Sequence, residues 1–324
     1  MSKRQNGTRL VAPVFRAVAV AGAVLGAGLL TSCALAWPSP QTIPAPDTDL
    51  GVKTVSIPSG SGSTLRAWLV RGETGHGAVL LFHGAHENRL SMLARARFLH
   101  ALGFTVLAPD FQAHGESPGK RITFGARESL DAAAAFAYLR QAAPAERIGV
   151  IGVSMGGAAA LLGPGPLKAD AFVLESVYPT IAHATRARLD VWFGPLGVVG
   201  RSLAPTVIAF VGRSAGVSEA ELQPIERIDE VRAPLLVISG ALDRYTPLVE
   251  AESLYAHAPE PKGFWAIDGA THGDLHEFAK EVYERRIGEF LTVHLARRVP
   301  FIVTHAAASA DSASPLQRRS ARQN

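Results

Sequence analysis

The segment GVIGVSMGG, residues 149–157, constrains the fold of this 324-residue chain more than any other stretch. It places four glycines around one serine, although glycine weakens both helices and strands. An apolar run precedes Ser154 and an alanine-rich run follows it, which predicts a strand, a tight turn and a helix. Gly152 and Gly156, two positions to either side, remove side chains that would collide in such a turn. The pattern is typical of a nucleophilic serine displayed at the end of a strand.

Short apolar runs alternate with helical patterns through the middle of the chain. Two of these runs predict a hairpin, over residues 52–57 and 64–70. Six more predict buried parallel strands, over residues 78–82, 104–108, 147–153, 171–175, 235–239 and 263–267. This alternation predicts an α/β fold with a doubly wound, mainly parallel sheet and right-handed crossovers, in one domain over residues 51–303.

Apolar spacing predicts the buried faces of three helices. They are Leu90, Leu93, Ala94, Phe98 and Leu102; then Leu130, Ala134, Ala137 and Tyr138; and finally Leu275, Phe278, Ala279, Val282, Phe290 and Val293. Residues 178–232 are too many for one crossover helix, so we expect a helical cap insertion over the carboxyl ends of the strands. Its apolar runs, 191–200 and 205–212, could line an acyl-binding pocket or simply pack on the sheet.

The chain begins like an exported protein. Basic residues precede the apolar run 17–30, which is shorter than the roughly 20 residues of a spanning helix. The run ends in LTSC, which resembles the lipobox of bacterial lipoproteins and predicts a signal sequence over 1–32 with lipidation of Cys33. A plain secretory signal and an uncleaved anchor are the alternatives. All three place the body outside the cytoplasm, in the cell envelope, and lipidation would attach it to a membrane.

The composition limits which partners and cofactors we expect this chain to bind. Residues 33–50 contain four prolines and predict an extended spacer, and residues 304–324 predict a disordered tail. The net charge of +4 comes from the two ends, since residues 17–295 carry −4, so no nucleic-acid partner is expected. One cysteine excludes an internal disulfide. His83 and His86 lack a third ligand, so we expect no metal and no cofactor. The oligomeric state stays open.

A serine hydroxyl becomes a nucleophile only when a base removes its proton, and an acid must orient that base. Asp243 and His272 each follow a predicted strand, and the loops after parallel strands share one edge of the sheet. We therefore expect His272 as the base and Asp243 as its acid partner. Glu175 is the alternative acid and His276 the alternative base. Three further histidines, His183, His257 and His294, are expected at the surface.

The developing oxyanion of an acyl transfer needs two N–H donors. One should be the backbone N–H of Met155, directly after the serine. The other should be that of Ala85, in the loop HGAHEN over residues 83–88 after a predicted strand. His83 is expected to position this loop rather than to transfer protons.

Five segments in order, HGAHENR, FTVLAPDFQAHGES, IGVSMGG, SGALDRYTP and IDGATHG, resemble the α/β-hydrolase superfamily. The likeness is greatest to its serine-aminopeptidase-like and prolyl-oligopeptidase-like branch, and it covers residues 50–295. The resemblance implies the triad Ser154, Asp243 and His272, with Ala85 and Met155 as oxyanion donors. Residues 112–117, QAHGES, depart from the family's R-G-H-G-x-S pattern, which leaves the substrate's shape open.

These features predict a serine hydrolase that cleaves a small-molecule acyl ester or thioester through an acyl-enzyme. A serine peptidase is the first alternative, and Glu175 or Asp190 could then bind the charged end of a peptide. A membrane-tethered binding protein that has lost the reaction is the second.

Overall fold

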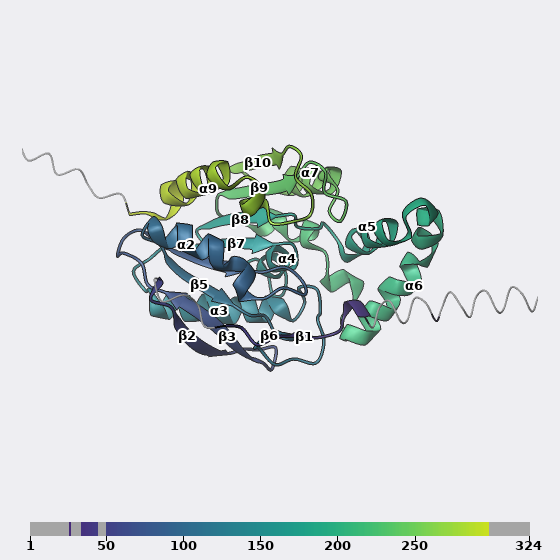
Figure 1. The fold of residues 1–324 in the computed structure, drawn as a ribbon, viewed down its shortest axis with the longest axis horizontal. Helices are drawn as coiled ribbons and strands as arrows, with labels where there is room; N and C mark the ends of the chain where they lie inside the picture. Colours follow the sequence, from purple (N-terminus) through teal and green to yellow (C-terminus); the bar gives the residue numbers. More distant parts are fainter. Residues whose placement is uncertain (1–25, 27–33, 45–49, 298–324) are drawn as a thin grey trace, which may run out of the picture.

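The computed structural model describes residue 26 and residues 34–44 and 50–297 (Figure 1). Its centre is an eight-stranded sheet in the order β10-β9-β8-β7-β4-β5-β3-β2. The strands are β2 (Lys53–Pro58), β3 (Thr64–Val70), β4 (Ala78–Phe82), β5 (Thr105–Pro109), β7 (Ile148–Val153), β8 (Ala171–Glu175), β9 (Leu235–Gly240) and β10 (Lys262–Ile267). Only β3 pairs antiparallel, with β2 and β5, while every other pair is parallel. The predicted doubly wound, mainly parallel α/β sheet is confirmed.

Helices cover both faces of this sheet, and each face has its own apolar core. The helices are α2 (Leu93–Ala101), α3 (Glu128–Ala142), α4 (Met155–Leu161), α5 (Ile181–Phe193), α6 (Gly197–Ala215), α7 (Leu248–His257), α8 (Leu275–Phe278) and α9 (Lys280–Leu295). One core joins the sheet to α3, α4 and α7, through side chains such as Leu139, Ala158 and Leu254. The other joins it to α2 and α9, through Leu99 and Leu291. This layering is the α/β-hydrolase arrangement.

The strand order fixes where a ligand can bind. The chain runs from β4 to β5 on one side and then crosses back to β7 on the other side of β4. At such a switch point the loops after the two strands diverge, and open α/β sheets bind ligands in the resulting crevice. Ser154 follows β7 and the 83–88 loop follows β4, so both lie at this crevice.

The long segment between β8 and β9 forms the helical cap. It consists of α5, α6 and four short 3-10 turns, at Gly194–Leu196, Glu219–Glu221, Pro224–Glu226 and Ile228–Glu230. The helices α5 and α6 pack against each other and extend away from the sheet beyond α4 (Figure 1).

The predicted buried faces of α2 and α3 are only partly right. Phe98 is buried as predicted, but Leu90 and Leu102 are exposed, and α2 also buries Arg95 and Leu99. The helix α3 buries Glu128, Asp131, Ala132, Ala135 and Leu139 in place of the predicted residues. The buried faces differ from the apolar spacing because they carry charged side chains, which form hydrogen bonds with buried polar groups of neighbouring loops. Glu128, for example, accepts hydrogen bonds from the backbone N–H groups of Thr123 and Gly125.

The predicted last helix is wrong in its continuity and only partly right in its buried face, where Leu275 is buried as predicted. It breaks at Ala279 into α8 and α9, because the φ of −124° and ψ of 38° at Ala279 are not helical. The exposed residues include Phe278, Val282 and Val293 from the predicted stripe. The buried stripe of α9 is Tyr283, Ile287, Leu291 and Leu295.

The N-terminal segment 34–44 differs from a free spacer. Residues 34–36 form a helical turn in which Leu35 and Ala36 are buried, and after it β1 (Ser39–Pro40) pairs in parallel with β6 (His114–Gly115). The carbonyl of Ala36 accepts from the N–H of Ile122. The segment lies on the domain because its apolar side chains and its backbone both find partners there.

The remaining N-terminal prediction, Cys33 with its signal sequence, lies outside the described residues apart from Gly26, and so does the predicted tail over 304–324. Within the described ranges, no helix combines the length and the apolar character needed to cross a membrane.

Candidate active site

Ser154 occupies the turn between β7 and α4. Its backbone is in the left-handed region, with a φ of 49°, and its N–H donates to the carbonyl of Glu175 at 2.8 Å. A Cβ added at Gly152 would lie 2.5 Å from the Cα of Gly157, and one at Gly156 would lie 2.4 Å from the carbonyl oxygen of Phe82. Both glycines are therefore required by close approach of backbone, and the tight turn predicted around the serine is present.

Asp243 and His272 form a hydrogen-bonded pair. The loop after β9 buries Asp243, whose Oδ1 accepts from the N–H groups of Tyr245 and Thr246 at 2.8 Å each. Its Oδ2 lies 2.8 Å from Nδ1 of His272, in the loop after β10. Because the carboxylate can only accept, Nδ1 carries the proton and Nε2 is left as the proton acceptor.

Backbone contacts hold the three loops at one edge of the sheet. The N–H of Ser176 donates to Ile238 and the N–H of Leu242 donates to Ala270, at 2.9 and 2.8 Å. The cap joins the same edge, because the Tyr245 ring lies 5.4 Å from the His272 ring and 5.7 Å from the guanidinium of Arg188.

Ser154 and Arg188 line one pocket. The His272 ring is not part of that lining, and it is linked to it through Tyr245, whose ring lies beside both His272 and Arg188. Among the described residues, no hydrogen bond joins Ser154 to His272. Such bonds are often long in free enzymes and shorten when substrate binds.

The two expected oxyanion donors lie in this pocket with Ser154. Met155 is the first residue of α4, so its N–H has no acceptor within the helix. In the part of the chain that the structure describes, neither the Met155 N–H nor the Ala85 N–H donates to another protein group. Two free N–H groups beside a serine can bind an oxygen that gains negative charge.

His83 holds the loop that carries Ala85. It is fully buried, its Nε2 accepts from the N–H of Phe111 at 3.1 Å, and its Nδ1 donates to the carbonyl of Gly84 at 2.7 Å. Burial lowers the pKa of His83 to about 4, so the ring is neutral near pH 7. These contacts fit the predicted positioning role.

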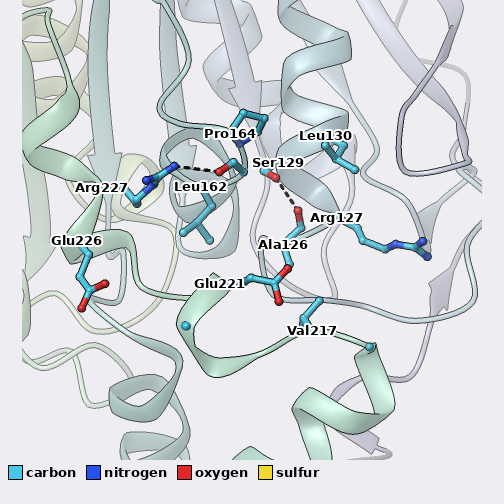
Figure 2. Close-up of a pocket in the computed structure, with 13 residues that line it drawn as sticks. Ala126, Arg127, Ser129, Leu130, Leu162, Pro164, Val217, Glu221, Glu226 and Arg227 are labelled. Carbon is cyan, nitrogen blue, oxygen red and sulfur yellow. Dashed lines mark hydrogen bonds between the residues drawn. The ribbon is translucent and has the colours of Figure 1, made fainter.

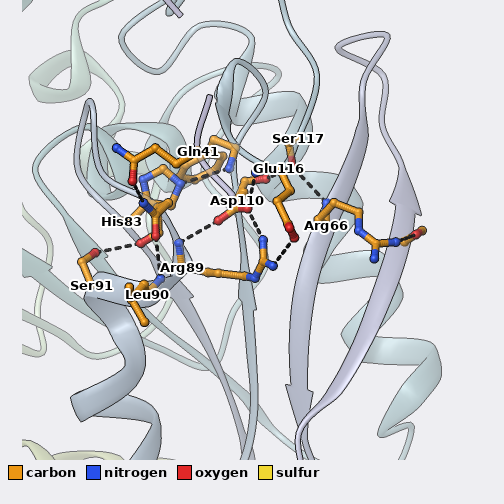
Figure 3. Close-up of polar contacts among 12 residues, drawn as sticks. Gln41, Arg66, His83, Arg89, Leu90, Ser91, Asp110, Glu116 and Ser117 are labelled. Atoms are coloured by element: carbon orange, nitrogen blue, oxygen red, sulfur yellow. Dashed lines mark hydrogen bonds and ion pairs between the residues drawn. The ribbon is translucent and has the colours of Figure 1, made fainter. Parts of the chain in front are cut away.

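A buried ion cluster supports the same loop (Figure 3). The Arg89 guanidinium pairs with both Asp110 and Glu116, and the backbone N–H of Arg89 donates to Asp110 at 2.7 Å. The cluster ties HGAHENR to PDFQAHGES, two segments that the sequence identified without indicating their contact. Glu116 lies in the stretch that departs from the family pattern.

The alternative acid and base are engaged elsewhere. Glu175 pairs with the buried Arg95 at 2.8 Å and accepts a hydrogen bond from the Tyr283 hydroxyl. Nε2 of His276 lies 2.9 Å from Glu284, and its ring stacks on another aromatic side chain. His183 and His257 are exposed on helices and His294 is partly exposed. The geometry therefore favours Asp243 and His272 over these alternatives.

The cap supplies one wall of the pocket. The whole pocket is lined by Leu35, Ala85, Phe124, Ser154, Met155, Tyr178, Ile181, Ala184, Thr185 and Arg188. Four of these lie on α5 at spacings of three and four residues, which places them on one helix face. None of the described side chains of 191–200 lines this pocket, which for them favours the alternative of packing within the cap. The sequence missed Tyr178 and Arg188, although the spacing along α5 could have indicated Arg188.

A larger cavity of about 570 Å³ lies between α3, the end of α4 and the cap turns (Figure 2). Two of its charged residues are already engaged, because Arg227 donates to Gly163 and Glu230, and Glu221 accepts from Ser218. It contains none of the predicted site residues. Over the described residues there is also no group of three His, Cys, Asp or Glu side chains that could hold a metal ion.

Comparison with known proteins gives consistent relatives. Residues 73–181 match the family model "Serine aminopeptidase, S33". The uncharacterized protein YqkD of Bacillus subtilis is 27% identical over 245 residues, covering 72% of this chain and 77% of that protein. The α/β-hydrolase domain-containing protein WAV2 of Arabidopsis thaliana is 28% identical over 250 residues, covering 72% and 77%.

Solved structures of esterases have the same fold. The esterase Pf2001 of Pyrococcus furiosus superposes with a TM-score of 0.65 and 26% identity, over 80% of this chain and 98% of that one. An esterase of Exiguobacterium antarcticum superposes with a TM-score of 0.55 over 74% of this chain and 99% of that one, and at 14% identity it bears on the fold alone.

Proposed function

This chain is a hydrolase of the α/β-hydrolase superfamily, and from that premise we propose that it cleaves carboxylic esters or thioesters through an acyl-enzyme formed on Ser154. The observation that carries the proposal is the 2.8 Å hydrogen bond between Asp243 and His272 at the sheet edge where Ser154 sits in its strained turn. A hydroxyl, an oriented imidazole and a buried carboxylate are the parts that acyl transfer needs.

Acylation begins when the Ser154 hydroxyl oxygen attacks the ester carbonyl carbon. Nε2 of His272 takes the hydroxyl proton, and the carbonyl oxygen becomes an oxyanion that accepts from the N–H groups of Ala85 and Met155. The intermediate collapses by breaking the bond to the leaving oxygen or sulfur, which receives the proton from His272. Asp243 stays ionised and stabilises the imidazolium. Each oxyanion donor contributes about 100-fold or more in rate.

Deacylation repeats these steps with water as the nucleophile. His272 takes a proton from water as the water oxygen attacks the acyl carbon, and the same two N–H groups bind the oxyanion. The bond to Ser154 then breaks, and the serine oxygen regains its proton from His272. The products are a carboxylic acid and the free enzyme.

The pocket supports an ester rather than a peptide substrate. An aminopeptidase needs an unpaired acidic group to bind the substrate's ammonium. Glu175 is paired with Arg95, and Asp190 lies 3.2 Å from Arg201, so neither is free for that role. Side chains such as Leu35, Phe124 and Ile181 give the pocket an apolar lining suited to an acyl chain.

Attachment of Cys33 to an envelope membrane is a second part of the proposal. Leu35 lines the pocket, so an anchor two residues earlier in the chain would hold the pocket close to the bilayer. Replacing Cys33 by alanine should move the protein from the membrane fraction to the soluble fraction. A variant that remains wholly membrane-bound would show that lipidation of Cys33 does not retain it.

Turnover of 4-nitrophenyl butyrate tests the reaction. We expect Ser154→Ala to lower kcat by about 10⁴-fold or more, as loss of a nucleophile does in related chemistry. Ser176→Ala is the matched control, because Ser176 is also buried at a strand end with a φ of 48°. Equal loss in both variants, or retained activity in Ser154→Ala, would contradict the assignment. A preference for aminoacyl anilides over esters would favour the peptidase instead.

A further inference from the structure

We propose that Arg188 binds an anionic group of the substrate, so that the enzyme prefers esters bearing a carboxylate at the far end of the acyl chain. This inference rests on the proposed ester hydrolysis at Ser154. It adds a substrate class and a specificity-determining residue to that function.

The first observation is position. Arg188 lies on α5, on the helix face that also carries Ile181, Ala184 and Thr185, and it lines the pocket together with Ser154. The side chain is partly buried, and its guanidinium lies over the Tyr245 ring. A cation is therefore built into the wall of a pocket that is otherwise mostly apolar.

The second observation is the missing counter-charge. Arg89 pairs with Asp110 and Glu116, and Arg95 pairs with Glu175 and Asp274. Arg188, by contrast, has no ion pair and no hydrogen bond with any described residue. The two fully buried guanidinium groups, those of Arg89 and Arg95, thus each have two carboxylate partners, whereas the partly buried Arg188 has none and lies where substrate would bind.

The nearby polar groups do not neutralise this charge. The Asp243 carboxylate is close enough to favour the charged guanidinium, but its oxygens already accept from His272 and from the N–H groups of Tyr245 and Thr246. The Tyr178 hydroxyl donates to the carbonyl of Phe124, and burial raises the pKa of Tyr178, which keeps it neutral.

Burial disfavours the charge that Arg188 carries. It lowers the pKa of the guanidinium, while the Tyr178 and Tyr245 hydroxyls and the Asp243 carboxylate oppose the shift. Arginine nevertheless stays protonated in proteins. A charge held away from water without a partner is unfavourable, and a bound anion would remove that penalty.

The chemistry of the pocket selects the anion. The planar guanidinium presents paired N–H donors that match the two oxygens of a carboxylate. Apolar side chains, including those of Ile181 and Ala184, line the pocket together with Arg188 and Ser154. The pocket is narrow, with a volume of about 10 Å³, so a methylene chain would have to widen it on binding. A half-ester of a dicarboxylic acid has both parts, since its ester carbonyl can meet Ser154 while its free carboxylate meets Arg188.

A matched pair of substrates tests this directly. One is the 4-nitrophenyl half-ester of adipic acid, and the other is the same molecule with its far carboxylate methylated. We expect wild type to prefer the free carboxylate in kcat/KM by at least about tenfold, as a charge-assisted hydrogen bond allows. In Arg188→Gln this ratio should fall to about one, and in Arg188→Lys part of it should remain.

Arg186→Gln is the matched control, because Arg186 lies on the same helix but is exposed and outside the pocket. It should keep the wild-type ratio. A wild type without preference overturns the proposal, and so does an equal loss in Arg186→Gln and Arg188→Gln, which would indicate only general electrostatic attraction.

A binding measurement separates this inference from the proposed reaction. Free adipate should raise the Tm of Ser154→Ala, and the added change Arg188→Gln should abolish the shift. If neither ester is turned over while adipate still raises the Tm through Arg188, the esterase proposal fails and the anion site stands. If esters are hydrolysed but adipate has no effect and no preference exists, the anion site fails and the esterase stands.

Discussion

Arg95 and Arg188 occupy two regions of the molecule that treat a packed cation in opposite ways. Between α2 and α9, Arg95 meets the carboxylates of Glu175 and Asp274 and the ring of Tyr283. On the cap, Arg188 meets only an aromatic ring and the narrow pocket that Ser154 also lines. In the first region the protein itself neutralises the cation, and the resulting polar cluster holds the sheet and helices together. In the second region the protein supplies no counter-charge, and we propose that a bound anion does.

The difference teaches how to separate structural charges from functional ones in this fold. Glu175 and His276 were candidates for the reaction by sequence, yet both belong to closed clusters. The groups expected to act on substrate keep spare hydrogen-bonding capacity, namely Nε2 of His272, the N–H groups of Ala85 and Met155, and the guanidinium of Arg188. Ala85, Met155 and Arg188 line one pocket with Ser154. Unused hydrogen-bonding capacity at a shared crevice indicates ligand binding.

The largest expected effect comes from the two histidines four positions apart. His272→Ala should lower kcat on a 4-nitrophenyl ester by about 10⁴-fold or more, because the base is lost. His276→Ala should leave kcat within about tenfold and instead lower the Tm, since His276 is buried and stacks on Phe98. Comparable loss of kcat in both variants, with both folded, would contradict the assignment of His272.

The next effect compares the two arginines in stability. Arg95→Gln leaves Glu175 and Asp274 without their cation and should lower the free energy of unfolding by about 3–5 kcal/mol. Arg188→Gln removes a charge without a partner and should change it by less than about 1 kcal/mol, toward higher stability. Urea unfolding followed by circular dichroism measures both. A large loss in Arg188→Gln would mean that Arg188 is structural.

A smaller effect should appear at Glu250, on α7. Burial raises the pKa of Glu250 to about 7, with the Asp243 carboxylate as the second cause. The folded state therefore binds a proton that the unfolded state releases above about pH 4.5, so stability falls as pH rises toward 7.

Glu250→Gln removes this dependence. After allowance for its partial exposure, the variant should be more stable than wild type by about 1 kcal/mol at pH 8 and equal to it at pH 4. Thermal melts across that range measure the difference. A wild type and variant with parallel curves would contradict the raised pKa.

Much of the fold follows from sequence. The strands β4 and β8 have the predicted bounds, β7, β9 and β10 differ by one residue at one end, and β5 is shifted by one residue at both ends. These predictions succeed because a strand buried on both faces is a continuous apolar run. The tight turn at Ser154 was predictable for a different reason, because close backbone approach at Gly152 and Gly156 excludes any side chain.

The helix faces were less predictable. Apolar spacing assumes that polar residues face water, whereas Arg95 and Asp131 point into the domain and are satisfied there. For the same reason the position of Arg188 in the pocket was not predicted, because the sequence does not indicate whether a charged residue on a helix faces solvent or a pocket. The contact of Asp243 with His272 depends on a β9–β10 pairing that only the assembled sheet provides.

Mapping of a fluorophosphonate adduct tests the central claim most directly. The probe reacts only with a serine whose hydroxyl is activated, and peptide mass spectrometry locates the modified residue. We predict one adduct per chain, on Ser154, and none in Ser154→Ala or His272→Ala. An adduct on another serine, or none on folded wild-type protein, would contradict the claim that Ser154 is the nucleophile.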